Sequence, residues 1–286
     1  MTATSDGHRG WKRYRWIILR RCVQLAVVGL FLLGPLYEIW WAKGNLASSL
    51  WLDTIPLSDP FIMAQSWLAL GSITQTALLG AVIVVVFYTL VGGRVFCSWV
   101  CPINVVTDAA HWCRQKLRLP PGWRPQRQLR HWLLLMSLIV SAMTGSIVWE
   151  LVNPVTMVHR AFVFGIGAAW AIIAAVFLFD MLVSRRGWCG HLCPVGAFYG
   201  ILGRASLVRV SASDREACTD CGDCFEVCPE PQVIAPALHG KLGDTRVITD
   251  GDCTNCGRCI DVCPDDVFRF GLRNNQPGPQ AKPTQG

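Results

Sequence analysis

The sequence contains CTDCGDCFEVCP at residues 218–229 and a near copy, CTNCGRCIDVCP, at residues 253–264. Each segment has the spacing Cys-x2-Cys-x2-Cys-x3-Cys-Pro, which is typical of bacterial proteins that bind two [4Fe–4S] clusters. Three cysteines of one segment surround a cluster, and the fourth ligates the cluster of the other segment. The spacing therefore predicts a small α+β ferredoxin domain at residues 217–270 with two interleaved clusters. Two adjacent clusters form an electron relay, but they do not by themselves make an enzyme.

The same rule assigns the ligands of each cluster. The first cluster is predicted to take Cys218, Cys221, Cys224 and Cys263. The second is predicted to take Cys253, Cys256, Cys259 and Cys228. Zinc sites also use paired cysteines, but zinc needs only four ligands and does not explain a third cysteine and a Cys-Pro pair in each segment. Disulfides are disfavoured because the domain is expected to face the reducing cytoplasm.

The rest of the chain is strongly apolar. Over all 286 residues, 52% are hydrophobic and 16% are charged, which excludes a disordered chain and a highly charged nucleic-acid binder. A bilayer span takes about 20 apolar residues. Four spans are predicted, at residues 22–41, 72–91, 132–151 and 162–183.

These spans define the expected domain organisation. An all-α domain of four transmembrane helices is expected at residues 1–198, and a connector at 199–216 leads to the ferredoxin domain. Residues 271–286 are rich in Pro, Gln, Asn and Gly and are expected to form a disordered tail. The first span is too long for a signal peptide and has no small-residue cleavage site after it, so an uncleaved anchor is expected.

Lysine and arginine predict the orientation of the spans. Residues 1–21 carry 6 of them, 92–131 carry 7 and 184–286 carry 11, whereas 42–71 and 152–161 carry one each. The positive-inside rule then places both termini and the middle loop in the cytoplasm of a bacterial inner membrane. The net charge of +7 thus belongs to the membrane flanks, and no basic soluble surface remains to bind nucleic acid.

A second motif occurs once after the second span and once after the fourth. GGRVFCSWVCPINVV at 92–106 and SRRGWCGHLCPVGAF at 184–198 share Arg-x-aromatic-Cys-x3-Cys-Pro. The repetition predicts two helical hairpins of one design, packed side by side.

The cysteines of this motif are a further candidate site. They are Cys97, Cys101, Cys189 and Cys193. A spacing of four residues places both thiols of a pair on one helical face. The two pairs can then supply four thiolates to an additional metal or cluster, or form a redox dithiol, and the alternative is that they pack as small apolar residues. Cys22 and Cys113 have no partner pattern and are interpreted as packing residues.

Acidic residues inside predicted spans are candidates for proton transfer. Glu38 and Glu150 are expected near the outer face and Asp180 near the inner face. Oxidation of a quinol releases two protons with two electrons, so Glu38 or Glu150 can act as the proton acceptor. The alternative is that these side chains reach water from helix ends. The sequence has no C-x-x-C-H motif for c-type haem, and His191 within the second cysteine motif is interpreted as an interfacial side chain.

In these features the chain resembles the NapH family over about residues 15–270. The shared features are four spans, Cys-x3-Cys-Pro after the second and fourth, and a C-terminal two-cluster ferredoxin domain. MauN-type proteins of methylamine utilisation share this plan, whereas the longer NosR-type and CcoG-type relatives have additional domains.

The resemblance implies a function. It implies a quinol dehydrogenase subunit that takes electrons from the quinone pool and passes them to a periplasmic nitrate reductase through a NapG-like ferredoxin-type partner in the periplasm. Because charge counting places the clusters inside, the electrons must cross a membrane core about 30 Å thick by way of a quinone, a cluster at the membrane cysteines or another subunit. The competing hypothesis is an assembly factor that reduces a metal or thiol on a client enzyme.

Overall fold

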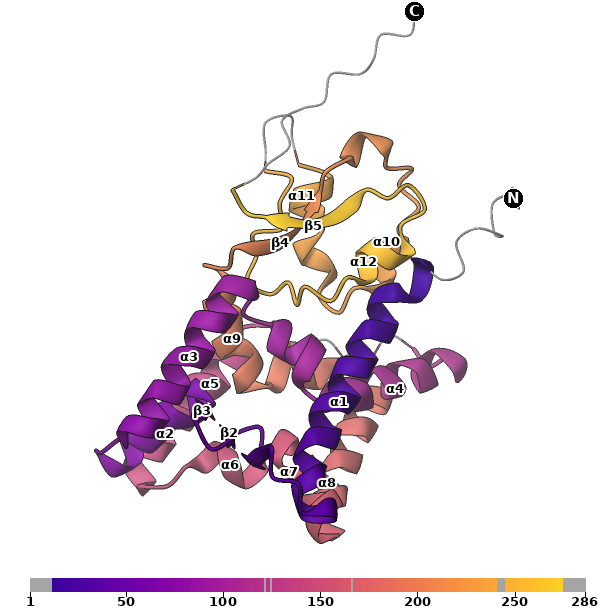
Figure 1. Ribbon diagram of the computed structural model, residues 1–286. Helices are drawn as coiled ribbons and strands as arrows, with labels where there is room; N and C mark the ends of the chain where they lie inside the picture. Colours follow the sequence, from indigo (N-terminus) through magenta and orange to yellow (C-terminus); the bar gives the residue numbers. More distant parts are fainter. Residues whose placement is uncertain (1–11, 121, 124, 166, 241–244, 275–286) are drawn as a thin grey trace, which may run out of the picture.

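Long apolar helices extend away from a small ferredoxin-like unit at one end of the molecule (Figure 1). The computed structural model describes residues 12–274, apart from 121, 124, 166 and 241–244. The long helices are α1 (Arg15–Tyr37), α3 (Gln75–Val91), α5 (Leu129–Thr144) and α8 (Gly167–Leu178), and a π-helix at Phe179–Val183 continues α8. In the described part of the chain, α1 alone is both long and apolar enough to cross a membrane by length and composition, and the other three helices are apolar but shorter. Four spans therefore stay a prediction.

The helix ends differ from the predicted spans because local capping decides them. Glu38 adopts a left-handed conformation with φ 60° and ends α1. The stretch 132–151 is interrupted where Gly145, with φ 65°, ends α5, and the short helix α6 (Val148–Val152) follows. Glycine adopts positive φ at little cost, so it commonly ends helices. Hydropathy averages over such positions and does not detect them.

Residues 42–58 form a small antiparallel sheet, so the prediction of an all-α domain at 1–198 is wrong here. The strands β1 (Ala42–Gly44), β2 (Ser48–Trp51) and β3 (Ile55–Ser58) lie in that order. They are too short to show a clear alternating pattern. The strand β3 packs against α3 at Gly80, where a Cβ atom would lie 3.0 Å from the backbone nitrogen of Ser58.

Two short helices show that the internal repeat extends beyond the cysteine motif. The side chain of Asp59 caps α2 (Pro60–Leu70), and Asn153 caps α7 (Pro154–Phe164) in the same way. Both helices begin with proline, which suits the first helical position because its missing N–H would have no partner there. Each repeat then continues with an apolar helix, a π-helix that carries the cysteines, and a further helix, α4 (Ile103–Lys116) or α9 (Pro194–Gly203).

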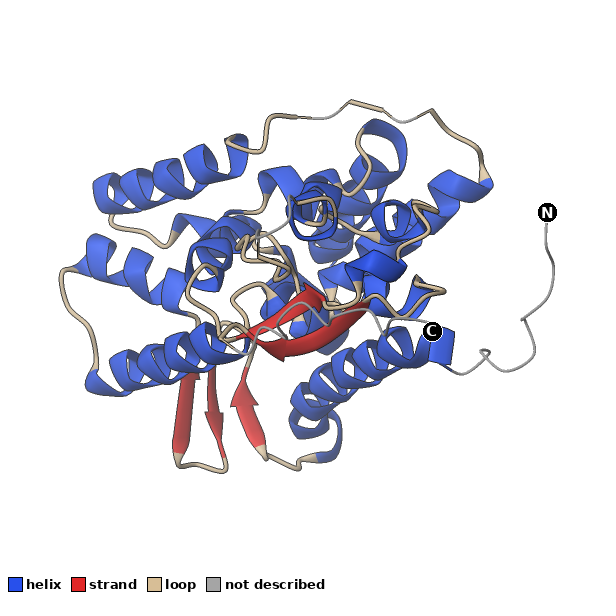
Figure 2. Cartoon of the chain, turned by 90° about the horizontal axis from the view of Figure 1, so that it is seen from above, coloured by secondary structure: helices blue, strands red, loops and turns tan. Residues whose placement is uncertain are grey.

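The ferredoxin-like unit is built on one two-stranded sheet. The strand β4 (Val208–Ala212) pairs antiparallel with β5 (Phe268–Leu272), and this sheet lies over the middle of the helical layer in Figure 2. Its short helices are α10 (Asp223–Val227), α11 (Ala235–Leu238) and α12 (Arg258–Val262). The predicted connector 199–216 therefore contains all of β4, and β5 reaches into the predicted tail, of which residues 275–286 lie outside the described residues.

Two cores stabilise these parts. The helical part contains an aromatic cluster in which the ring of Phe198 contacts those of Phe61 and Tyr199. The rings of Phe96 and Tyr199 stack with centroids 5.0 Å apart. The four membrane cysteines belong to or border this core. The ferredoxin-like unit has its own core around Val210 and Phe268, against which its cysteines pack.

Candidate iron–sulfur and membrane-cysteine sites

Four ferredoxin cysteines line a cavity of about 250 Å³ at an exposed edge of the domain. They are Cys218, Cys221, Cys224 and Cys263. Burial and the neighbouring thiols of Cys221 and Cys263 raise the pKa of the Cys224 thiol to about 11. Metal binding at this set must therefore release protons, because thiolates are the ligands. We refer to these four residues as the outer set.

The other four ferredoxin cysteines line a second cavity, against the helical layer. They are Cys228, Cys253, Cys256 and Cys259, which we call the inner set. Burial opposes ionisation of the Cys256 thiol, but the guanidinium groups of Arg20 and Arg258 lower its pKa. In both cavities the fourth cysteine comes from the other segment, so the structure brings together the two groups that the spacing predicts. A donor set of four thiols around a cavity fits a [4Fe–4S] cluster.

The thiols surround these cavities and do not meet at one point. Among the residues that the structure describes, no group of three or more His, Cys, Asp or Glu side chains is placed to hold a single metal ion. Thiolates that share one zinc ion lie about 3.8 Å apart, given tetrahedral geometry and Zn–S distances of about 2.3 Å.

The membrane cysteines lie on two equivalent π-helices. Cys97 is in the segment Phe96–Val100 and Cys189 in Trp188–Leu192. Each segment ends at the second cysteine of its pair, whose N–H donates to the carbonyl five residues earlier at 2.9 Å. Turns of π-helix are rare and occur frequently at functional sites. The two π-helices occupy the same place in both repeats, and each carries the first cysteine of its pair.

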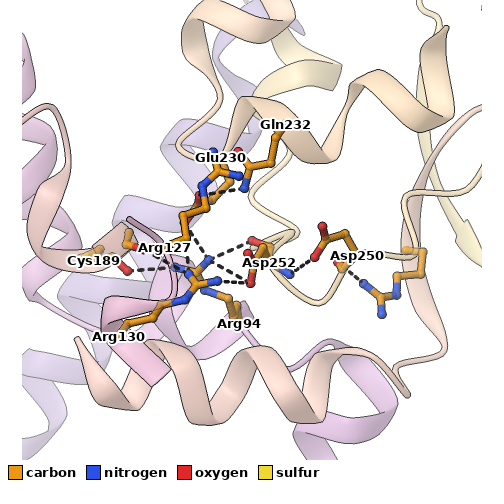
Figure 3. Close-up of polar contacts among 10 residues, drawn as sticks. Arg94, Arg127, Arg130, Cys189, Glu230, Gln232, Asp250 and Asp252 are labelled. Atoms are coloured by element: carbon orange, nitrogen blue, oxygen red, sulfur yellow. Dashed lines mark hydrogen bonds and ion pairs between the residues drawn. The ribbon is translucent and has the colours of Figure 1, made fainter. Parts of the chain in front are cut away.

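A buried charge network joins the ferredoxin-like unit to the helical layer. Figure 3 shows Arg94 and Arg130 converging on Glu230 and Asp252. The guanidinium of Arg94, 2% exposed, lies 2.9 Å from the carboxylate of Glu230, which is 3% exposed. Arg94 also donates to the backbone carbonyls of Asp252 and Cys189, each at 3.0 Å. Arg130 pairs with both carboxylates.

A second charge network lies around Asp108 of α4. Its carboxylate pairs with Arg21, Arg186 and Arg258, the last of which belongs to α12 of the ferredoxin-like unit. Burial opposes ionisation, but Arg258 and Arg186 hold the pKa of Asp108 well below its usual range. This carboxylate therefore stays charged and ties α12 to α4.

Direct hydrogen bonds also link the first π-helix to the inner set. The hydroxyl of Ser98 donates to the carbonyl of Thr254 at 2.7 Å, and the indole of Trp99 donates to the carbonyl of Asn255 at 3.0 Å. Thr254 lies between two cysteines of the inner set. The loop that carries the inner set thus rests on the segment that carries Cys97.

The remaining predicted site residues lie apart from these networks. Glu38 is exposed at the end of α1, whereas Glu150 lies 3.4 Å from Arg160 and accepts a hydrogen bond from Asn153. No described contact brings the two glutamates together. Asp180 is fully buried and accepts a hydrogen bond from the N–H of Trp188.

Cys22, Cys113 and His191 are likewise separate from the ligand sets. Cys22 is exposed on α1, and Cys113 is partly buried on α4. The side chain of His191 lies in the second π-helix but does not line the cavity beside Cys189.

Sequence reasoning missed the two charge networks. Arg94 and Arg186 occupy the same position in the repeated motif, three residues before its first cysteine, and this was the available signal. Their acidic partners carry no local signal, because Glu230 and Asp108 are distant from them in the chain.

Comparison with known proteins gives matches over nearly the whole chain. A family model described as "4Fe-4S binding domain" matches twice, at residues 73–120 and 166–211, in agreement with the internal repeat. A model described as "4Fe-4S dicluster domain" matches residues 217–267. No solved structure is significantly similar to the chain.

Several curated proteins are close relatives. The methylamine utilization ferredoxin-type protein MauN of Methylorubrum extorquens is 51% identical over 268 residues, which cover 94% of this chain and 93% of the relative. MauN of Paracoccus denitrificans is 53% identical over 87% of both chains. The ferredoxin-type protein NapH of Haemophilus influenzae is 47% identical over 94% of this chain and 93% of the relative.

Proposed function

The chain belongs to the family of ferredoxin-type proteins that includes NapH and MauN, and on this premise we propose that it takes electrons from quinol and relays them through two [4Fe–4S] clusters. It is an iron–sulfur electron-transfer protein. The observation that carries the proposal is the position of the inner set: its loop accepts hydrogen bonds from Ser98 and Trp99 of the helical layer, whereas the outer set lines a cavity at an exposed edge. A relay that starts at a membrane substrate and reaches the outer set through the inner set needs this order.

The cysteines of the outer and inner sets are the proposed cluster ligands, and bound clusters would supply one-electron transfer. The protein's own contribution is rigid placement. Arg94 and Arg130 hold Glu230, the second residue after Cys228, and Asp108 holds Arg258 next to the inner set. These buried pairs fix the distance between the inner set and the helical layer.

We propose that the helical layer spans a bacterial inner membrane four times. Its helices expose many large apolar side chains on their outer faces, among them Leu25 at 70%, Leu79 at 55%, Phe87 at 53% and Met143 at 81%. A soluble protein rarely exposes so many large apolar side chains. Lysine and arginine counts support a cytoplasmic position of the ferredoxin domain. A reporter fused after Gly286 that is active only outside would refute this orientation.

Glu38 and Glu150 are the proposed acceptors of the protons released by quinol. Both follow the ends of helices that lead away from the ferredoxin-like unit. If either carboxylate accepts a proton from quinol, its replacement by glutamine slows cluster reduction by quinol but not by dithionite. Equal rates with both glutamine variants would exclude this role.

The relatives support two alternative electron acceptors for this chain. The NapH relatives support delivery to a periplasmic nitrate reductase through a NapG-like partner. Identities of 51–53% to MauN equally support a role in methylamine utilization. Deletion of the gene, followed by growth on nitrate or on methylamine, separates these two functions.

The decisive experiment is reduction of the clusters by quinol. The purified protein is reconstituted in vesicles, treated with ubiquinol or menaquinol analogues, and followed by EPR spectroscopy. Quinol is expected to reduce the clusters, and Cys256→Ala is expected to abolish the signal of the inner set. Clusters that dithionite reduces but that neither quinol reduces would refute the proposal and favour an assembly factor.

A further inference from the structure

An open cavity lies where α1, α4 and the ferredoxin-like unit meet, and we call it the α4 cavity. Its volume of about 470 Å³ lies within the range of about 300–1,000 Å³ in which pockets hold small molecules. Arg21 of α1 and Asp108 of α4 line one part of it, and Val227 and Arg258 of the ferredoxin-like unit line another. Arg186, in the turn before the second π-helix, also lines it. In Figure 1, α4 extends to the side of α1, beneath the ferredoxin-like unit.

Three guanidinium groups in the wall of the α4 cavity share one carboxylate. Arg21 and Arg258 both pair with Oδ2 of Asp108, and Arg186 lies 3.4 Å from its Oδ1. Each guanidinium carries five N–H donors, so two carboxylate oxygens cannot satisfy them all. The Nε atoms of Arg186 and Arg258 are buried and have no hydrogen-bond partner among the described residues. Since Glu226 is the other acidic residue in the wall, one positive charge is in excess.

The imidazole of His111, 8% exposed, lines the same cavity. Burial and the guanidinium groups of Arg186 and Arg185 lower the pKa of His111 to about 4, so the ring is neutral at neutral pH. Its Nδ1 has no hydrogen-bond partner among the described residues. The positive surroundings that disfavour a proton on this ring favour an anionic ligand in the cavity.

The exposed edge of the α4 cavity is apolar. Val105 and Trp112 of α4 are 39% and 59% exposed, and Ile17 of α1 lies in the same wall. Tryptophan is enriched where a membrane meets water. Arg21 directly precedes the predicted span that begins at Cys22, so the cavity lies at the head-group level of the proposed membrane. A buried cationic wall and an exposed apolar edge thus occur side by side.

A ligand that suits both surfaces is an amphiphile with an anionic head. Phosphate oxygens accept parallel hydrogen bonds from guanidinium groups, and basic pockets between transmembrane helices bind lipid head groups. We propose that the α4 cavity binds the phosphate head group of an anionic phospholipid, with its oxygens facing Arg21 and Arg186 and its acyl chains along Val105 and Trp112. Through Arg258 the lipid also contacts the ferredoxin-like unit. This inference rests on the proposed membrane position of the helical layer.

Native mass spectrometry of the full-length protein tests this site. The protein is purified anaerobically in detergent and titrated with phosphatidylglycerol or with phosphatidylcholine. One phosphatidylglycerol per chain should bind, and more tightly than phosphatidylcholine. Arg21→Gln should weaken the binding of phosphatidylglycerol about tenfold, the effect of one lost charge-assisted hydrogen bond. Arg118→Gln is the matched control, because this exposed arginine follows α4 but does not line the cavity, and it should leave the affinity unchanged.

A second variant leaves every charge in place. Val105→Trp fills the apolar edge without removing an ion pair of Asp108, and it should also weaken the binding of phosphatidylglycerol.

Three results would overturn the inference. Equal affinity of the unaltered protein for the two lipids would exclude an anion-selective site, and unchanged affinity in both variants would place the lipid elsewhere. Displacement of bound phosphatidylglycerol by equimolar inorganic phosphate or by a short-chain quinol would assign the cavity to that ligand. Flotation with phosphatidylcholine vesicles tests the membrane position separately, and an unaltered protein that does not float with them would refute the premise itself.

Discussion

Replacing Arg94 by glutamine should lower the free energy that holds the ferredoxin-like unit against the helical layer. We call the contact between these two parts the joint. Arg94 is almost fully buried and makes an ion pair with Glu230 and two hydrogen bonds to backbone carbonyls. Removing one partner of a buried ion pair costs about 3–5 kcal/mol. Glu230 keeps Arg130 at 3.4 Å, so the lower end of this range applies and we expect about 3 kcal/mol.

Hydrogen exchange measures this cost at the joint itself. Backbone amides in residues 252–255 become exchangeable when the inner-set loop separates from the helical layer. A loss of about 3 kcal/mol corresponds to exchange that is about a hundredfold faster. The amides of β4, within the ferredoxin-like unit, should change much less, because the unit has its own core.

Arg127 provides the matched control. Its side chain is 41% exposed and lies 3.8 Å from the same carboxylate of Glu230. Exposed ion pairs contribute about 0–1 kcal/mol, so Arg127→Gln should change the exchange by less than about fivefold. If both variants accelerate exchange to the same extent, the buried pair does not hold the joint and the reasoning is wrong.

Three further predictions follow from particular contacts. Gly80→Val should destabilise the protein by about 1–3 kcal/mol in chemical denaturation, because the side chain would collide with β3, whereas Gly29→Val, with free space around it, should have a smaller effect. The pKa of Asp108 is depressed in the folded state, so the ion pairs of Asp108 stabilise the fold fully above the unfolded pKa of about 3.9, and this stabilisation is lost as the pH falls toward the folded pKa. In Asp108→Asn the free energy of unfolding should therefore depend less on pH in this range. An unchanged acid transition would contradict the assigned pairing. Cys256→Ala should remove the EPR signal of the inner set, while Cys221→Ala should remove that of the outer set, and loss of the same signal in both would contradict the two groups.

The spacing predicts two groups of cysteines because ligand spacing is a local property, and the same residues line two cavities in the structure. The four thiols of the inner set lie in two short segments, and the crossing of Cys228 follows from a known pattern. Hydropathy likewise locates the apolar helices, but their ends depend on single residues such as Gly145 and Glu38. The sheet at residues 42–58 escapes prediction because its strands have only three or four residues and are held by their neighbours in the fold, α1 beside β1 and α3 beside β3.

The charge networks could not be predicted, because their partners meet only in the folded chain. Arg94 and Glu230 are 136 residues apart, and Asp108 and Arg258 are 150 apart. The repeated motif shows that an arginine precedes each cysteine pair, but it does not show what that arginine contacts. In this protein the chemically important charges are therefore the least visible in the sequence.

The two equivalent arginines explain how a single ferredoxin domain docks on a repeated helical layer. Two similar repeats offer two similar π-helices, and a domain that recognised only their shared features could dock in two ways. Arg186 of the second repeat pairs with Asp108 of the first repeat's α4, whereas Arg94 of the first repeat pairs with Glu230 of the ferredoxin-like unit. The acidic partners thus differ although the arginines correspond. Buried charges can fix a single docking arrangement of two parts in this way. Here they hold the inner set against the first repeat.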